Sequence, residues 1–428
     1  MKLLQKVYNS RVATLLSLII SRILLDYVYI KFITPGYSYR GLTYTYSIGR
    51  YILSWIVFAI TIALIFWIEK RNYDESHKGA IIINILLCVS AVPTTTIIAY
   101  FDLSIFFSAF VVVYWVLVVF IYERRAKTVN KFTISLKQQK MVFYLLTALF
   151  AINLIVVLRY TGIQVNFNLL DVYDARSAFK TNQIPTIFRY LFFGSTMAFP
   201  VIVVYALKKK KYFLASIVIA CQILAFFADG RKASLFILVL TVLGHFFIRS
   251  FNIRIIPFGS AAVIIAGCLE KWIFHSRLIV NFIVRRLYII PAYLQYAYYD
   301  FFSSNEKDLL RQSIMGRIGF KSPYSIPIAN VIGNEYYGGS YCNNGLMADG
   351  FANFGVIGVL LYPILVAVAL RFLDKCSSNL SCGVCIGIIF AMSFAFLSSF
   401  FFAVLLTHGF LICCLVVYLM PLIKNDTL

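Results

Sequence analysis

The sequence predicts an all-α, polytopic integral membrane protein with about twelve transmembrane helices. Of its 428 residues, 61% are hydrophobic and only 13% are charged, whereas a soluble domain carries about 25% charged residues. A membrane-spanning helix needs roughly 20 predominantly apolar residues, and stretches of this kind follow one another along the whole chain. We therefore expect residues 1–428 to form a single membrane domain.

The predicted spans are separated by short polar loops. In chain order they are Val12–Phe32, Ile48–Ile68, Ala80–Ala99, Leu103–Tyr122, Met141–Tyr160, Thr186–Leu207, Tyr212–Ala228, Ala233–Ile248, Ile255–Leu269, Phe351–Phe372, Gly383–Phe402 and Ala403–Ile423. No small-residue cleavage site accompanies the first stretch, so we interpret it as a retained span and not as a signal peptide.

The net charge of +22 arises mainly from basic loops that alternate along the chain. These loops contain Lys2, Lys6 and Arg11; Lys70, Arg71 and Lys78; Arg124 through Lys140; Lys208 to Lys211; Arg249 and Arg254; and Arg371 and Lys375. Because cytoplasmic loops are enriched in Lys and Arg, the pattern predicts that both termini are cytoplasmic. Topology thus explains the basic excess, and no nucleic-acid partner is expected. The sequence also lacks the phosphate-binding pattern G-x-x-x-x-G-K-[ST], which argues against ATP-driven transport by this chain.

Loops on the opposite, outward face should be poor in positive charge, yet three of them carry it. The first charged loop, 162–184, contains LDVYDARSAFK, and a tight hinge at Asp229–Lys232 reads DGRK. The third is the large loop 272–350. Arg pairs bidentately with phosphate, so these bases predict binding of an anionic group. The alternative is that they anchor the chain at the lipid headgroups. Within the hinge, Gly230 is expected to adopt a positive φ angle.

The large outward loop has two parts. His275 to Phe302 alternates basic and apolar residues near helical spacing and ends in a Tyr cluster. This part fits either a helix in the membrane interface or a helix packed over the spans, with Pro291 breaking or kinking it. Gly333 to Gly358 is rich in Gly and Asn, which favours close backbone turns and a tightly packed helix entering the bilayer.

Three motifs together resemble the O-antigen polymerase family, the Wzy-type oligosaccharide repeat-unit polymerases. They are ADGRKASLF at Ala228–Phe236, the preceding outward loop with Arg176, and NNGLMADGFANFGVIG at Asn343–Gly358. In the family, an apolar span commonly ends in a small residue followed by Gly-Arg, and an acidic residue precedes an aromatic-x-Phe-Gly-x-x-Gly helix start. The R-x10-G motifs described for some members are absent from both outward loops.

The resemblance implies a metal-independent membrane glycosyltransferase without a cofactor, located in the bacterial inner membrane. It would join oligosaccharide units carried on undecaprenyl pyrophosphate at the periplasmic face, in the biosynthesis of lipopolysaccharide O-antigen. Membrane lipid and a separate chain-length regulator protein are the other implied partners. Pyrophosphate is already a good leaving group, so the reaction needs cationic donors, a base near the acceptor hydroxyl, and positioning.

The sequence offers candidates for each of these roles. For the pyrophosphate we expect Arg176, Arg231 and Arg317, with Arg277, Arg285 and Arg286 as further candidates. For the base, Asp349 is favoured, followed by Glu335 and His275. Asp349 is also well suited to cap the following helix. No D-x-D sequence is present to chelate a metal ion with a nucleotide-sugar, which suits a lipid-linked donor.

Two other functions remain open. A flippase or other transporter predicts polar residues along a path through the membrane and a repeat between the two halves of the chain, and no repeat is visible. Intramembrane charge is limited to Arg22 and Asp26, whose i, i+4 spacing predicts that they pair with each other. An O-antigen ligase, which transfers finished glycan to a lipid core, would share the overall layout.

Overall fold

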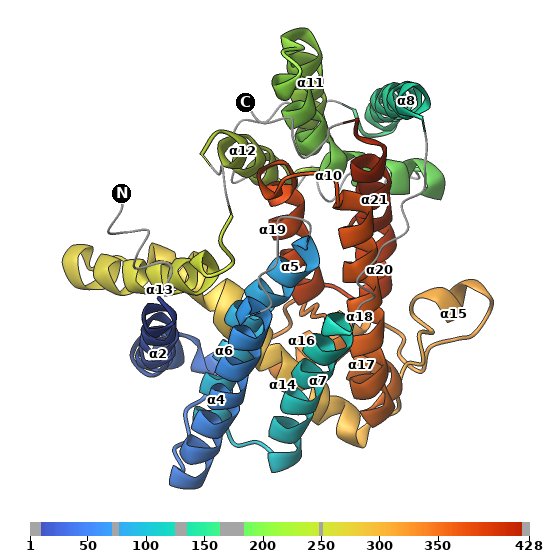
Figure 1. The fold of residues 1–428 in the computed structure, drawn as a ribbon. Coiled ribbons are helices and arrows are strands. Elements are labelled where there is room, and N and C mark those ends of the chain that lie inside the picture. The colour runs from blue at the N-terminus through green and yellow to red at the C-terminus, as the bar shows by residue number, and fades with distance from the viewer. Residues whose placement is uncertain (1–9, 71–76, 125–134, 163–183, 248–250, 422–428) are drawn as a thin grey trace.

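A computed structural model of the chain describes residues 10–421 except for 71–76, 125–134, 163–183 and 248–250. Every regular element within the described ranges is a helix (Figure 1). Serine side chains begin three of the long helices, because the hydroxyl oxygens of Ser10, Ser104 and Ser135 accept hydrogen bonds from first-turn N–H groups. These bonds satisfy donors that have no partner within the helix.

The first half of the described chain contains α2 (Arg11–Val28), α3 (Thr34–Tyr37), α4 (Ile48–Lys70), α5 (Lys78–Leu86), α6 (Val92–Tyr100), α7 (Ile105–Glu123), α8 (Leu136–Thr161) and α10 (Thr186–Lys208). Two π-helical segments, η1 (Tyr29–Ile33) and η3 (Leu87–Ala91), connect α2 to α3 and α5 to α6, and a 3-10 turn, η2 (Ser38–Arg40), follows α3.

The second half contains α11 (Tyr212–Asp229), α12 (Lys232–Phe247), α13 (Ile255–Phe274), α14 (Ile290–Ser304), α15 (Ile314–Arg317), α16 (Ile328–Tyr336), α17 (Met347–Phe354), α18 (Val356–Ser377), α19 (Cys382–Ser398), α20 (Phe401–Leu406) and α21 (Phe410–Leu419). A third π-helical segment, η4 (Val280–Ile289), leads directly into α14.

Fewer helices are long enough to cross a membrane than the sequence predicted. Ten helices among the described residues are long and apolar enough to cross a membrane. Two more predicted spans coincide with shorter apolar helices, α12 with 16 residues and α19 with 17. The all-α membrane class is therefore confirmed, whereas the count of twelve is not.

The axis of the bundle is the continuous helix formed by α5, η3 and α6. Its most apolar window is 94% buried, more than that of any other candidate span in the described chain. This helix packs against α4, α18 and α19 and lies near the centre of Figure 1. Pro93 stands at the start of α6, directly after η3, where the wider π-helical turn accommodates a residue that cannot donate a backbone hydrogen bond.

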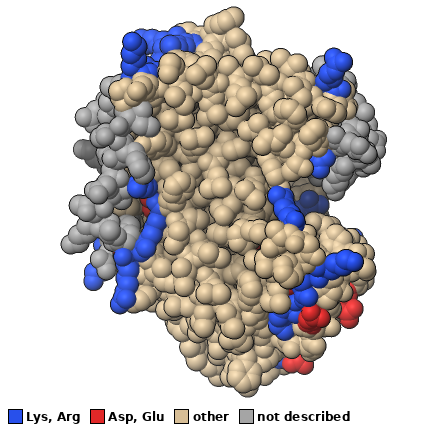
Figure 2. Space-filling view, turned by 90° about the vertical axis from the view of Figure 1, so that its right-hand side faces the viewer, with Lys and Arg blue, Asp and Glu red and all other residues tan. Residues whose placement is uncertain are grey.

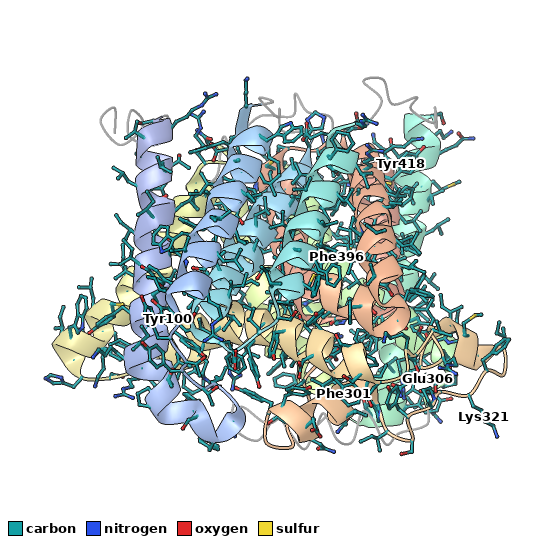
Figure 3. All side chains as sticks on the ribbon, turned by 90° about the horizontal axis from the view of Figure 1, so that it is seen from below. Tyr100, Phe301, Glu306, Lys321, Phe396 and Tyr418 are labelled. Atoms are coloured by element: carbon teal, nitrogen blue, oxygen red, sulfur yellow. The ribbon has the colours of Figure 1, made fainter. Side chains whose placement is uncertain are left out.

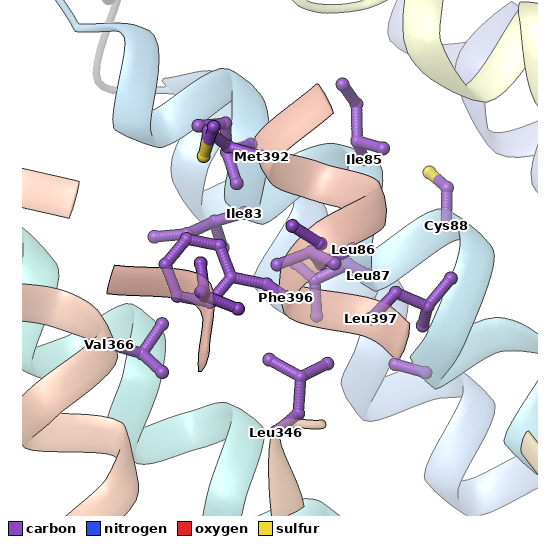
Figure 4. Close-up of a cluster of buried hydrophobic side chains, with 14 of the residues drawn as sticks. Ile83, Ile85, Leu86, Leu87, Cys88, Leu346, Val366, Met392, Phe396 and Leu397 are labelled. Atoms are coloured by element: carbon purple, nitrogen blue, oxygen red, sulfur yellow. The ribbon is translucent and has the colours of Figure 1, made fainter. Parts of the chain in front are cut away.

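The apolar core surrounds this central helix. Side chains from α5, η3, α18 and α19 meet with Leu346 in one cluster (Figure 4). Four of these side chains are no more than 2% exposed: Ile83, Leu86, Phe396 and Leu397. Helices that surround the centre expose one apolar face, as expected for contact with lipid.

A buried ion pair connects the first three spans. Arg22 of α2 is fully buried and pairs with Asp26 one turn later, as the i, i+4 spacing predicted. Its guanidinium also donates to the hydroxyl of Thr96 at 2.9 Å and to that of Ser54 at 3.0 Å. These bonds join α2 to α4 and α6, so the pair has a structural role.

The two ends of the bundle differ in construction. Figure 3 shows the long helices side by side, with Tyr418 toward one end and Phe301, Glu306 and Lys321 toward the other. We call them the Tyr418 end and the α15 end. Near the α15 end, η4 and α14 run obliquely across the bundle (Figures 1 and 3).

The segment predicted as the large outward loop is largely helical. Most residues of α14 are buried against neighbouring helices, which favours the packed-helix interpretation of His275 to Phe302 over an interfacial helix. Pro291 does not break this segment, because it occupies the first turn of α14 directly after η4. The predicted span Phe351–Phe372 is interrupted, since Gly355 at φ +58° separates α17 from α18.

Candidate functional site

The turn between α11 and α12 holds Arg231 in a fixed position. Gly230 ends α11 at φ +62°, which confirms the predicted positive φ angle. The carboxylate of Asp229, which is 3% exposed, accepts hydrogen bonds from the backbone N–H of Arg231 at 2.9 Å and from its Nε atom. Asp229 therefore orients the guanidinium while leaving its two terminal nitrogens for other partners.

Arg231 packs on the first half of α10. Its guanidinium lies 4.2 Å from the ring centroid of Phe193, and a terminal nitrogen lies 3.4 Å from the hydroxyl of Thr196. A cation over an aromatic face is attracted by the ring quadrupole. The side chain remains 25% exposed, so one edge of the guanidinium is accessible to a ligand.

Arg317 contacts the same helix one turn away. This residue ends the short helix α15, donates to the hydroxyl of Tyr190, and stacks over the Tyr190 ring at 5.4 Å. Tyr190 and Phe193 are three residues apart, which separates them by about 4.5 Å along α10. The structure thus brings two of the predicted pyrophosphate ligands, from distant parts of the sequence, onto successive turns of one helix.

A histidine that the sequence reasoning missed completes this group. His408 lies in the break between α20 and α21, where Gly409 adopts φ +73°. The adjacent Gly409 packs on α10, because a Cβ atom there would lie 3.2 Å from the backbone oxygen of Phe193. The signal was present in the sequence, because an ionisable residue inside a predicted span, followed by Gly, is unusual. We call Arg231, Arg317 and His408, with Phe193 and Tyr190, the α10 site.

Basic side chains line a hollow in the surface on the side where α15 lies. Figure 2 looks at the side of the molecule on which α15 lies and shows a hollow with Lys and Arg side chains in its wall. Below the hollow, acidic and basic side chains gather together. In the segment just before α15, Arg311 pairs with Glu306 at 2.7 Å, and the buried carboxylate of Asp308 accepts from the Ser322 hydroxyl at 2.6 Å.

A second group of arginines is held by tyrosines. Arg285 is 8% exposed, lies 4.1 Å from the ring centroid of Tyr37, and donates to the hydroxyl of Tyr337 at 2.9 Å. The guanidinium of Arg40 also lies over the Tyr337 ring, 5.5 Å from its centroid. Because Arg285 is enclosed by its partners, its position indicates a structural role more than ligand binding.

The remaining predicted arginines are separate from the α10 site. Arg277 and Arg286 are exposed and lie over the rings of Phe32 and Phe282 at 5.8 Å and 5.5 Å. This arrangement is typical of side chains that reach from an apolar surface toward polar surroundings. Arg176 lies outside the described residues.

The favoured base, Asp349, occupies an enclosed position. Its carboxylate is 1% exposed and accepts from the backbone N–H of Phe401 at 2.6 Å and from the Asn353 amide at 2.8 Å. Burial raises the pKa of Asp349 to about 7, although hydrogen bonds from Phe401, Tyr362 and Asn353 act in the opposite direction. The expectation that Asp349 caps the following helix is wrong: Gly355 stands before α18, and the Asp349 carboxylate accepts instead from the first N–H of α20.

The two other base candidates are exposed. Glu335 lies on α16, and His275 ends α13 at φ +53°, where its backbone carbonyl accepts from Lys271 at 3.1 Å. Among the residues that the structure describes, no hydrogen bond or ion pair joins either of them to the α10 site. Within the described ranges, no three His, Cys, Asp or Glu side chains are grouped so that they can hold a metal ion.

Comparison of the chain with protein-family models, with curated proteins and with solved structures gives no match.

Proposed function

We propose that this chain is a repeat-unit polymerase of the O-antigen type, which joins oligosaccharides carried on undecaprenyl pyrophosphate. The observation that carries the proposal is the α10 site: two arginines from distant segments pack on successive turns of α10, next to the turn that holds His408, near the α15 end of a membrane bundle. Arginine forks suit a pyrophosphate because they bind its oxygens bidentately and stay protonated.

The proposed reaction is a glycosyl transfer without a metal ion. A hydroxyl of the acceptor sugar forms a bond to the anomeric carbon of the donor sugar, and the bond from that carbon to the pyrophosphate oxygen breaks. Arg231 and Arg317 stabilise the negative charge that develops on the leaving undecaprenyl pyrophosphate. The acceptor hydroxyl gives its proton to the imidazole of His408, which we propose as the base in place of Asp349 because it is partly exposed and its neighbour Gly409 packs on Phe193 of the α10 site.

Gene deletion in the source bacterium tests the proposal through the gel profile of its lipopolysaccharide. Loss of a polymerase collapses the ladder to lipid core plus one repeat unit. Loss of every glycan-bearing band indicates ligation or translocation instead, and an unchanged ladder contradicts all three activities.

Complementation with variants tests the site. Arg231→Ala and Arg317→Ala should each shorten the ladder, whereas Arg286→Ala, which removes an exposed arginine over Phe282, should leave it intact. His408→Ala should abolish polymerisation at normal protein abundance. A full ladder from the Arg231→Ala, Arg317→Ala double variant would refute the pyrophosphate assignment.

A transporter for the same lipid-linked oligosaccharide is the second candidate, and one observation favours it. The last span is discontinuous, because residues Thr407–Gly409 separate α20 from α21. Broken spans of this kind hold substrates in many transporters. The two functions separate in the same deletion strain: a transporter defect leaves no glycan outside the membrane, whereas a polymerase defect leaves single units.

A further inference from the structure

A lateral groove lies between three helices toward the Tyr418 end of the bundle. It has a volume of about 190 Å³ and opens between α8, α10 and α11. Its lining includes Tyr144, Ala148, Ala151, Phe199, Leu214 and Val218. The α8 and α11 residues recur at helical spacing, so the groove follows both helices for about 10 Å. Its walls are apolar except for the Tyr144 and Thr147 hydroxyls.

Lysines stand at one end of this groove. The turn between α10 and α11 is Lys208–Lys211, and the Nζ atom of Lys211 donates to the Tyr144 hydroxyl at 2.6 Å. Lys140 lies four residues before Tyr144 on α8, and therefore on the same face of that helix. Gln139 bonds the backbone carbonyl of Tyr418 at 3.0 Å, which places this mouth at the Tyr418 end.

Backbone hydrogen bonds fix the conformation of the turn Lys208–Lys211. Lys210 adopts φ +53°, a left-handed conformation that Gly normally occupies after a helix. The backbone N–H groups of Lys209, Lys210 and Lys211 are all bonded to carbonyls of the last turn of α10. Tyr212 and Phe213, directly after the turn, are 64% and 82% exposed. Exposed aromatic residues next to lysines are typical of the level of the lipid headgroups.

We propose that this groove is a binding site for one anionic phospholipid. The headgroup phosphate binds the ammonium groups of Lys210, Lys211 and Lys140, and one acyl chain lies against Ala148 and Ala151. Charge complementarity selects the headgroup, because clustered basic residues at a membrane surface attract anionic lipids. The two alanines leave the space that the chain occupies. The site is separate from the α10 site and does not depend on the proposed function.

Native mass spectrometry of the purified full chain measures the binding directly. The protein is exchanged into detergent with phosphatidylglycerol or with phosphatidylcholine of identical acyl chains. We expect one tightly retained phosphatidylglycerol and at least tenfold weaker retention of phosphatidylcholine. A photoactivatable phosphatidylglycerol with its reactive group on the acyl chain should label peptides of α8 and α11. Equal retention of the two lipids, or labelling confined to other helices, would overturn the proposal.

Two pairs of variants distinguish lipid binding in the groove from general attraction of anionic lipids to a basic protein. Lys210→Gln with Lys211→Gln should weaken phosphatidylglycerol binding at least tenfold, whereas Lys70→Gln with Arg124→Gln, which removes two charges elsewhere, should not. Ala151→Leu narrows the groove and should also weaken binding, whereas Ile152→Leu, on the exposed face of the same helix, should not. If Ala151→Leu binds like the native chain, or if both charge pairs weaken binding equally, the lipid has no groove site and the proposal fails.

Discussion

Arg22 shows how a single charged residue can determine the packing of several spans. Its guanidinium is buried and bonds Asp26, Thr96 and Ser54, so three helices depend on it. Removing one member of a buried ion pair leaves the other charge without compensation, which costs far more than the pair itself contributes.

Arg22→Leu should therefore lower the free energy of unfolding by about 3–5 kcal/mol. The double variant Arg22→Leu, Asp26→Leu should recover part of this loss, because no unpaired carboxylate remains. Thermal unfolding in detergent measures both effects. The exposed Arg286→Leu serves as the control and should change stability by less than about 0.5 kcal/mol. Equal effects of Arg22→Leu and Arg286→Leu would contradict the structural role.

Asp349 should make stability depend on pH. Burial raises its pKa in the folded chain to about 7, above the value near 4 of an exposed aspartate. The folded state therefore binds a proton that the unfolded state releases, and the associated stability is present below about pH 4 and lost as the pH rises toward 7. We expect the unfolding temperature to fall by several degrees between pH 5 and pH 8.

The matched variant for this prediction is Asp349→Asn. Its amide oxygen still accepts from the Phe401 N–H, but it does not titrate, so its unfolding temperature should change less over the same pH range. Parallel pH profiles for the two proteins would show that Asp349 is not the group responsible.

At the scale of elements, the break in the last span is fixed by close packing. Gly409 adopts φ +73°, and a Cβ atom there would lie 2.7 Å from the Cα atom of Gly194 on α10. The break therefore places His408 beside α10 only while both positions remain glycine. The position of His408 in the α10 site therefore depends on the backbone contact between Gly409 and Gly194.

Gly409→Ala should consequently destabilise the protein by at least about 1–2 kcal/mol, the strain of a left-handed conformation alone. Gly259→Ala is the control, because this helical glycine of α13 has nothing within 4 Å of the added Cβ atom, and a better helix former should leave stability unchanged or raise it by up to about 1 kcal/mol. Unfolding midpoints distinguish the two. A neutral Gly409→Ala would mean that α20 and α21 can adjust around this contact.

At the scale of the whole molecule, the two ends of the bundle should face different compartments. The basic loops predict that the Tyr418 end is cytoplasmic and that the α15 end faces outward. A membrane-impermeant maleimide should label Lys321→Cys in spheroplasts with an intact membrane, and Lys210→Cys only after the membrane is opened. The reverse pattern would invert the topology and remove the α10 site from the periplasmic face.

Composition and hydropathy were sufficient to predict the fold class, because apolar length is a local property. The ion pair of Arg22 and Asp26 and the positive φ of Gly230 were predicted for the same reason. Contacts between distant segments were not predictable: nothing in the sequence near Arg317 indicates that it lies on Tyr190. Asp349 was recognised as a special position, but its partner Phe401 lies on a different element and could not be inferred from the motif.

The helix at the centre of the bundle also has a consequence for biogenesis. Residues 78–86 of α5 leave the ribosome before α18 and α19, against which they pack, are made. Until then Asn84 of α5, which is fully buried in the finished structure, lacks these late neighbours. Chains that stop before residue 356 should therefore present a polar side chain inside the bilayer and be selected for degradation.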